Sequence, residues 1–253
     1  MVKKMEVIGL SDFPMVRPGD DLGELIVKVA KKNGVELESG DIIVVSQKVV
    51  SKAENRIINL EDVVPSKEAL FLAEIARKDP SLVQLILDES EEIIKVLKGH
   101  IIARTKHGIV CANAGIDRSN VAGSESIVTL LPEDPDESAR VIRERIEELT
   151  GKRIAVVITD TYGRPLRRGQ VNVAIGVSGL KPFRDYRGLY DLFGYRLRVK
   201  RITVADEIAA AAELVMGNGA EGVPVAIVRG ANVELGEGSA KEINMPENRW
   251  FFK

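Results

Sequence analysis

The 253-residue chain has few of the residues on which many enzymes depend. Its single cysteine, Cys111, excludes an internal disulfide framework and a thiolate-rich zinc site. Only two histidines are present, His100 and His107, which argues against a histidine-based triad or a histidine metal site. Candidate chemistry must therefore be sought among the carboxylate, amide and cationic side chains.

Long apolar runs and a strong net charge are also missing. No run approaches the roughly 20 residues that span a bilayer, and the N-terminus lacks the pattern of a signal peptide. The formal net charge is only -2, so overall electrostatics does not indicate nucleic acid or an acidic membrane. We therefore expect a cytoplasmic protein, with neither a membrane nor nucleic acid as its partner.

The common nucleotide-binding motifs are absent as well. There is no Gly-x-x-x-x-Gly-Lys-Ser/Thr, and no Gly-x-Gly-x-x-Gly is well placed after a predicted strand. Residues 217–222 (Gly-Asn-Gly-Ala-Glu-Gly) resemble a phosphate-binding turn in composition, but they end a predicted helix, where the helix dipole does not favour phosphate. A nucleotide site in this chain must therefore be of a less common kind.

The apolar patterns that are present predict both strands and helices. Strands are expected at residues 5–10, 42–45, 108–112, 154–161, 171–177 and 223–230, and those at 108–112 and 154–161 are expected to be buried. Helices are expected at residues 20–32, 66–77, 80–92, 138–149 and 205–216. Gly151 is a natural cap for the helix at 138–149. The length allows one large domain or two modest ones.

Two polar segments follow predicted strands. Asp117 comes shortly after the run at 109–112 and offers hard oxygen to Mg²⁺ or Mn²⁺. Asp160 and Thr161 come at the end of the run at 154–158, where a carboxylate is costly to bury without a cation or donor. One divalent cation shared by Asp117 and Asp160, with the Thr161 hydroxyl assisting, would satisfy both. The alternatives are an Asx-rich turn at 113–120 and a capping role for Asp160.

Basic residues lie close to these segments. Lys48 and Lys52, four residues apart after the strand at 42–45, either reach nucleotide phosphates or lie in a surface loop. Arg164, Arg167 and Arg168 either hold phosphate or a substrate carboxylate, or form a solvated basic face.

In this order the motifs resemble the GTP-dependent coenzyme F(420)-0:L-glutamate ligases, the gamma-glutamyl ligases of deazaflavin coenzyme biosynthesis. The specific combination is Asn-Ala-Gly-Ile-Asp, then Ile-Thr-Asp-Thr, then Met-Gly-x-Gly-x-x-Gly-x-Pro. The resemblance covers almost the whole chain and runs through residues 51–54, 113–120, 149–153, 158–163, 167–169, 205–208, 216–224 and 228–230.

The resemblance implies a fold and an assembly. We expect an α+β chain with mixed sheets that forms an intertwined homodimer. Residues 1–253 would form one ligase module with two structural subdomains, whose boundary the sequence does not define. The implied cofactors are Mn²⁺ or Mg²⁺ in two sites, with GTP as co-substrate and an effect of K⁺. The implied substrates are L-glutamate and a lactyl-phosphate-linked deazaflavin acceptor.

The resemblance also implies site residues. Asp117 and Asp160 would bind one metal, and Thr161 and Asn218 the second. The implied nucleotide contacts are Asp12, Phe13, Pro14, Met15, Gln47, Lys48, Lys52, Asn120, Met216, Gly217, Asn218, Gly219, Ala220, Glu221, Gly222 and Val223. No catalytic residue beyond these metal and phosphate ligands is implied. Relatives carry an acidic or amide ligand where this chain has Asn218, and a neutral amide predicts a weaker second metal site.

The expected chemistry is amide formation through an acyl phosphate. The acceptor carboxylate would attack the γ-phosphate of GTP, and the glutamate amine would then displace phosphate. Two alternatives remain. Asp117 and Asp160 would also serve a metal-dependent phosphohydrolase. The basic and aromatic stretch at 181–201 would also serve a non-catalytic nucleotide- or RNA-binding module, although an excursion between strands is favoured there.

Overall fold

A five-stranded mixed sheet forms the centre of the molecule. The computed structural model describes residues 3–121 and 123–251, and the strand order of this sheet is β1-β12-β2-β8-β9. The β2–β8 pair is parallel and the other pairs in the sheet are antiparallel. The strands are β1 (Glu6–Gly9), β2 (Ile42–Ser46), β8 (Ala155–Gly163), β9 (Gln170–Ser178) and β12 (Val225–Arg229).

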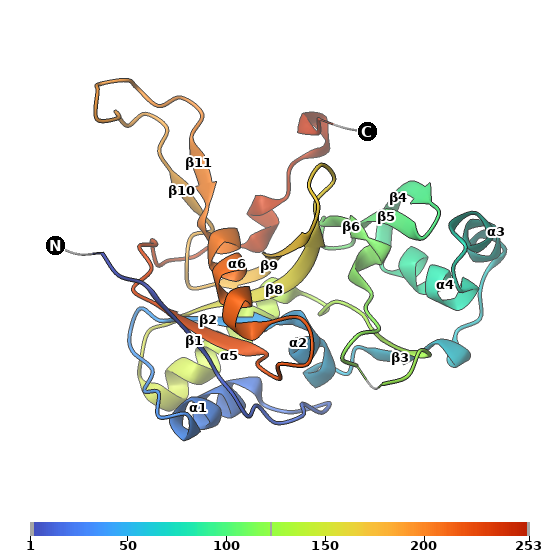
Figure 1. Cartoon of the computed structure of the whole chain (residues 1–253), viewed down its shortest axis with the longest axis horizontal. Coiled ribbons are helices and arrows are strands. Elements are labelled where there is room, and N and C mark those ends of the chain that lie inside the picture. The colour runs from blue at the N-terminus through green and yellow to red at the C-terminus, as the bar shows by residue number, and fades with distance from the viewer. Residues whose placement is uncertain (1–2, 122, 252–253) are drawn as a thin grey trace.

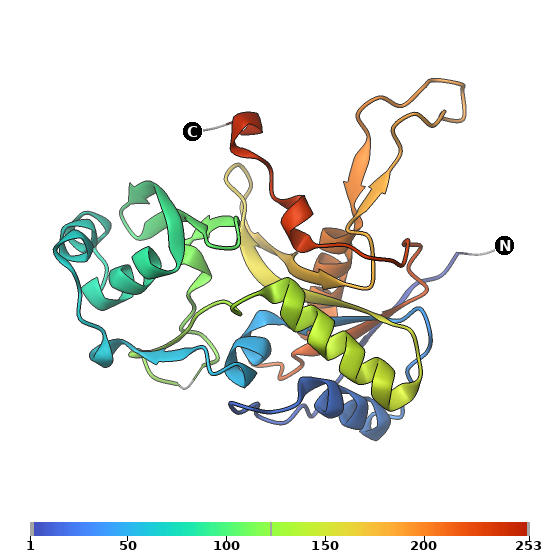
Figure 2. The ribbon, with the colours of Figure 1, turned by 180° about the vertical axis from the view of Figure 1, so that it is seen from behind.

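Helices cover both faces of this sheet, which explains its continuous apolar strands. Ile43 and Val45 face a core that includes α1 (Leu22–Lys32) and α5 (Pro135–Thr150), the helices at the front of Figure 2. The alternate residues of β2 face a second core under α6 (Val204–Met216), as the pleat requires (Figure 1). The mixed α and β architecture predicted from the sequence is confirmed.

Residues 57–130 contribute a third apolar core, which lies to one side of the central sheet (Figure 1). Its elements are β3 (Ile57–Asn59), α3 (Lys67–Ala76), α4 (Pro80–Asp88), β4 (Ser90–Leu97), β5 (His100–Thr105), β6 (Val110–Ala112) and β7 (Ile127–Thr129). This core is separate from the two cores of the central sheet. The division of the chain into two subdomains nevertheless stays a prediction.

Several predicted boundaries were wrong, because partner strands decide where an element ends. The helix expected at 80–92 ends at Asp88, and the following residues form β4, which pairs with β5. The strand expected to end at Asp160 and Thr161 continues to Gly163, because β9 pairs with it as far as Gln170. The strand expected at 108–112 forms only at Val110–Ala112, and it is a partly exposed edge strand, not a buried one.

The structure also contains a helix that was not predicted, and it confirms one predicted helix cap. The segment with Lys48 and Lys52 forms α2 (Gln47–Ala53), so the alternative of a surface loop is wrong. Gly151 caps α5 in the left-handed conformation, at φ 66°, as predicted. At the other end of α5, the Asp134 side chain accepts hydrogen bonds from the first backbone N–H groups.

A buried ion pair ties β12 to the start of β2. Arg229 donates two hydrogen bonds of 2.8 Å to Asp41, whose side chain is 1% exposed. We expect Asp41→Ala to lower the free energy of unfolding by about 2–3 kcal/mol, because it removes the buried partner of a half-buried guanidinium and leaves only the exposed Glu38 and the backbone oxygen of Glu36. Glu234→Ala, which removes the exposed partner of Lys181, should cost less than about 0.5 kcal/mol. Urea unfolding measures both, and equal losses would contradict this account.

Candidate functional site

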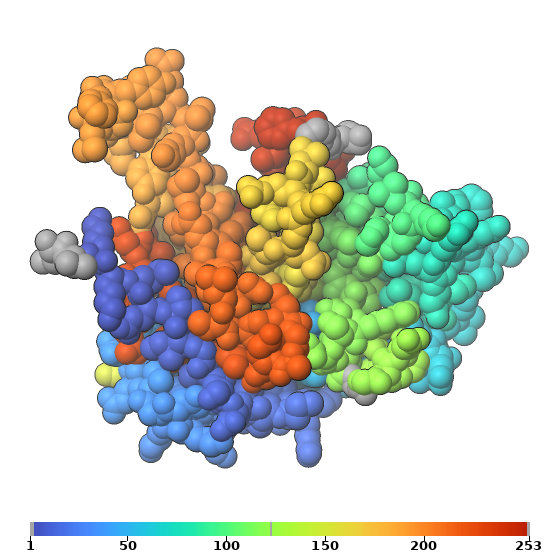
Figure 3. Space-filling view, in the orientation of Figure 1, coloured from blue at the N-terminus to red at the C-terminus, as the bar shows by residue number. Residues whose placement is uncertain are grey.

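A cavity of about 490 Å³ lies where four segments distant in the sequence meet. The N-terminal segment, α2, the loop after Asp117 and the loop after α6 all contribute to its wall. In Figure 3 the orange α6 segment borders the green loop on this face of the molecule. The volume is typical of small-molecule sites. The predicted nucleotide contacts on its wall are Phe13, Pro14, Met15, Lys48, Lys52, Asn120, Met216, Gly217, Asn218, Gly219, Ala220, Glu221, Gly222 and Val223.

The two lysines of α2 point at the loop that contains Asp117. Lys48 Nζ lies 2.9 Å from Asp117 Oδ2 and 2.8 Å from Ser119 Oγ. Lys52 Nζ donates to the backbone oxygen of Asn120 at 2.8 Å. Burial, together with the nearby charge of Lys48, lowers the pKa of Lys52. Two cations are therefore fixed on one face of a helix and at the wall of the cavity.

The loop after β6 holds a strained backbone. Asn113, Ala114 and Asn120 adopt left-handed conformations with φ between 53° and 57°, which few residues other than glycine adopt. Asp117 exchanges two backbone hydrogen bonds with Thr129, and Asn120 Nδ2 donates to the backbone oxygen of Gly219 at 2.8 Å. These contacts fix the loop against the segment after α6. Strain of this kind is concentrated at functional sites.

Asp117 and Asp160 are close enough to repel each other, and their environments differ. Burial and the Asp117 charge raise the pKa of Asp160 to about 7, although the backbone N–H of Thr161 opposes the shift. Burial also acts to raise the pKa of Asp117, but hydrogen bonds from Lys48 and Ser119 outweigh it and hold that pKa low. A half-buried pair of carboxylates with one cationic partner is the kind of site that a divalent cation stabilises.

Gln47 and Asp12 lie outside the cavity wall. Gln47 is 1% exposed and acts to lower the pKa of Asp160, yet its Nε2 has no partner with hydrogen-bond geometry among the described residues. The Asp12 side chain points to Lys32, with Oδ2 3.3 Å from Nζ. The structure therefore places Gln47 in the interior next to Asp160, and Asp12 at the surface.

A second polar cluster surrounds Thr161. Its hydroxyl oxygen lies 3.1 Å from Asn218 Oδ1 and 3.2 Å from Asn172 Oδ1. Adjacent oxygen ligands of an octahedral Mn²⁺ or Mg²⁺ are about 3 Å apart, so Thr161 and Asn218 fit the predicted second metal. The C-terminal end of α6, which precedes Asn218, also favours a cation.

The acidic residues do not form a complete metal site by themselves. Within residues 3–121 and 123–251, no group of three or more histidine, cysteine, aspartate or glutamate side chains is arranged to hold a metal. A cation here would need hydroxyl, amide, water or phosphate oxygens to complete its coordination, which is usual for Mg²⁺ bound with a nucleotide.

Two residues of the Thr161 cluster were missed by the sequence analysis. Asn172 lies directly opposite Thr161 in the register of β8 and β9, and it is 5% exposed. Glu213, on the last turn of α6, accepts a hydrogen bond of 3.0 Å from Asn218 Nδ2. Both would have been found only by placing β9 in register with β8 and by following α6 to its end.

The arginines after Thr161 lie in the turn between β8 and β9. Arg164 donates to the backbone oxygen of Arg168 at 2.9 Å, and Arg167 and Arg168 are exposed. None of the three lines the cavity in the part of the chain that the structure describes. Their roles as phosphate or carboxylate ligands stay predictions.

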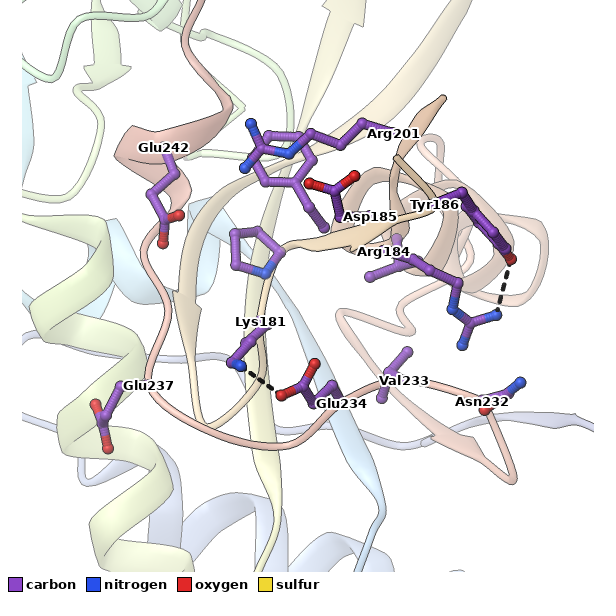
Figure 4. A pocket seen from close by; sticks show the side chains of 13 residues that line it. Lys181, Arg184, Asp185, Tyr186, Arg201, Asn232, Val233, Glu234, Glu237 and Glu242 are labelled. Atoms are coloured by element: carbon purple, nitrogen blue, oxygen red, sulfur yellow. Dashed lines mark hydrogen bonds and ion pairs between the residues drawn. The ribbon is translucent and has the colours of Figure 1, made fainter. Parts of the chain in front are cut away.

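A larger cavity, of about 800 Å³, lies at the base of the arm that carries β10 (Phe183–Asp185) and β11 (Arg201–Thr203). The guanidinium of Arg201 lies over the ring of Phe183, 3.4 Å from its centre. In Figure 4 Lys181 points to Glu234. Acidic side chains share the wall with the basic ones. The stretch at 181–201 is thus an excursion from the sheet. It carries seven basic and two acidic side chains, and the three glutamates of the cavity wall come from outside it.

No helix in the described residues is long and apolar enough to cross a membrane.

Comparisons with known proteins identify the family of the chain. The family model described as F420-0:Gamma-glutamyl ligase matches residues 11–230. Three relatives bear the name Coenzyme F420:L-glutamate ligase. The protein of Methanocaldococcus jannaschii is 46% identical over 253 residues, covering 99% of this chain and 98% of the relative. That of Methanothermobacter thermautotrophicus is 52% identical over 226 residues, covering 89% of each chain. That of Archaeoglobus fulgidus is 48% identical over 244 residues, covering 96% of this chain and 94% of the relative. The chain therefore belongs to the F420-0:gamma-glutamyl ligase family.

Proposed function

We propose that this chain is a GTP-dependent ligase that joins L-glutamate to the deazaflavin coenzyme F(420)-0 through an amide bond. The family and the names of the relatives support the acceptor and the amino acid. The observation that carries the rest is that two fixed lysines line one cavity, and that one of them, Lys48, also pairs with Asp117, which lies close to Asp160. Such a set of charges suits a nucleotide triphosphate with divalent cations.

In this proposal the chain binds and orients two substrates and the nucleotide. Lys48 and Lys52 hold the phosphates in the cavity. Asp117 and Asp160 would hold one divalent cation, and Thr161 and Asn218 a second. Bound Mn²⁺ or Mg²⁺ withdraws negative charge from phosphate oxygens. The effect of K⁺ implied by the resemblance is part of the same proposal.

The reaction then proceeds in two displacements. A carboxylate oxygen of the acceptor attacks the γ-phosphorus, the bond from that phosphorus to the bridging oxygen breaks, and GDP leaves. The amine of L-glutamate attacks the acyl carbon of the resulting acyl phosphate. The new C–N bond forms as the C–O bond to phosphate breaks, and the proton lost by the amine leaves with the phosphate. Positioning and charge neutralisation carry both steps, so neither needs a protein nucleophile.

Nucleotide turnover with and without each substrate tests this proposal. We expect GTP to be consumed only when both L-glutamate and the acceptor are present, with one amide formed for each GDP released. Turnover of GTP alone would show a phosphohydrolase, and binding without any turnover would show a non-catalytic module. A parallel series with ATP tests the choice of nucleotide.

We also propose that the chain works as a homodimer. The arm between β10 and β11 projects from the body (Figure 1), and Leu192 and Phe193 on it are 98% and 95% exposed. Large exposed apolar side chains on a projecting segment are typical of an interface. Light scattering should give about twice the 27.7 kDa mass of the chain. The double variant Leu192→Asp, Phe193→Asp should move the mass towards one chain, and a monomeric wild type would contradict the proposal.

A further inference from the structure

The side chain of Asn218 has a defined orientation. A carboxamide accepts hydrogen bonds through its oxygen and donates them through its nitrogen, so the two ends are not equivalent. Asn218 Nδ2 donates to Glu213 Oε1 at 3.0 Å, and Asn218 Oδ1 accepts from the Thr161 hydroxyl at 3.1 Å. An ionised carboxylate can only accept, so Glu213 can face only the nitrogen. The oxygen is thereby turned toward Thr161.

The neighbours on each side agree with this orientation. Asn172 Oδ1 is a second acceptor on the nitrogen side, 3.5 Å from Asn218 Nδ2. Glu213 itself is held by the helix, because its backbone oxygen accepts from Gly217 N at 2.8 Å. Asn218 follows that helix end and is otherwise exposed. Without Glu213, only the long contact to Asn172 would oppose rotation of the amide, which would present its N–H groups to Thr161.

We propose that Glu213 is a positioning residue for the second metal site. It directs the oxygen of Asn218 toward the place of the cation beside Thr161, and it adds a negative charge that the neutral amide lacks. The inference rests on the proposed function, since it requires a divalent cation at Thr161 and Asn218. Groups that orient a ligand from behind typically change metal affinity about 10–100-fold when they are removed.

Titration of Mn²⁺ in the presence of a non-hydrolysable GTP analogue tests this inference without turnover. Glu213→Lys replaces the acceptor with a donor, which should turn the amide round and weaken the second Mn²⁺ site about 10–100-fold. Glu213→Gln keeps an acceptor oxygen, so its loss should be smaller. The first Mn²⁺ site should be unchanged in both. The control is Glu207→Ala, on the same helix, whose carboxylate has no hydrogen bond or ion pair to the described residues. It should match the wild type.

A second set of variants, which carry Asn218→Asp, separates the effect of side-chain orientation from a general loss of structure. Asn218→Asp has an oxygen on both sides, so the direction of the side chain no longer matters. Alone, it brings a carboxylate against Glu213, which should offset the gain from the extra charge. Combined with Glu213→Lys, it should restore Mn²⁺ affinity to within about threefold of the wild type, a difference well under 1.4 kcal/mol. Melting temperatures confirm that each variant is folded.

The outcomes distinguish the inference from the function on which it rests. A wild-type protein that binds no Mn²⁺ with the analogue would overturn both. A wild type with two Mn²⁺ sites, of which Glu213→Lys weakens neither, would overturn the role of Glu213 and leave the proposed function standing. A double variant as weak as Glu213→Lys alone would also overturn the positioning role, because orientation would then not explain the loss.

Discussion

Replacing Asp160 with asparagine should abolish ligation and, at the same time, make the metal-free protein more stable. The raised pKa of Asp160, about 7, means that its ionised form is disfavoured in the folded protein. Removing the charge should therefore stabilise the metal-free fold above pH 7, by up to about 4 kcal/mol. The same change removes a charged group from the proposed metal site, and ligation should fall about a thousandfold or more. Urea unfolding in a chelator and a ligation assay with Mn²⁺ measure the two effects.

Asp117→Asn is the matched comparison, because the surroundings of Asp117 lower the pKa of its carboxyl, whereas those of Asp160 raise it. Hydrogen bonds from Lys48 and Ser119 hold the pKa of Asp117 low, so its charge stabilises the folded state. Asp117→Asn should also abolish ligation, but it should lower the free energy of unfolding by about 1 kcal/mol. If either variant keeps wild-type activity at limiting Mn²⁺, that residue does not bind the metal. Equal stability changes in the two variants would contradict the difference in environment.

The second large effect is a dependence of Mn²⁺ binding on pH. Because the pKa of Asp160 is about 7 in the metal-free protein, protons compete with the metal below that pH. Mn²⁺ should bind roughly 25-fold more weakly at about pH 5.5 than at about pH 7.5, as expected for one competing proton. Calorimetric titration at the two pH values measures this ratio. The ratio should be close to one in Asp160→Asn, and a flat profile in the wild type would contradict the raised pKa.

The ionisation of Asp160 also determines how the stability of the metal-free protein changes with pH. The folded-state pKa of Asp160 is raised above its unfolded value, so the folded protein binds more protons between about pH 4 and pH 7. Its contribution therefore destabilises the metal-free protein progressively as the pH rises through that window. Saturating Mn²⁺ should remove this dependence, because the metal binds the ionised form and the folded state then no longer takes up the extra proton.

Much of the central sheet was predictable, because its strands are buried on both faces and read as continuous apolar runs. Ile42 to Val45 and Ala155 to Ile158 are fully buried, as their composition indicates. The ends of the elements were less predictable. β8 extends past Asp160 only because β9 pairs with it, and α4 stops at Asp88 only because the next residues pair with β5. Pairing partners are distant in the sequence and leave no local pattern.

The candidate site was likewise predictable from the sequence only in part. Lys48, Lys52, Asn120 and the segment after Met216 were named from motifs, and the fold brings them to one cavity. The neighbours that orient them were not visible in the sequence. Asn172 depends on the strand register, and Glu213 depends on the way the chain turns at Gly217.

The most direct test of the proposed acyl phosphate follows an oxygen atom from the acceptor carboxylate to the released phosphate. The acceptor is prepared with oxygen-18 in its carboxylate and incubated with GTP, L-glutamate, Mn²⁺ and the protein. If the carboxylate attacks the γ-phosphorus, one labelled oxygen must leave with the phosphate when the amine displaces it. Mass spectrometry should therefore find one oxygen-18 atom in each inorganic phosphate and a product heavier by one glutamyl residue. Product formed with unlabelled phosphate would contradict the acyl phosphate, and phosphate released without product would contradict ligation.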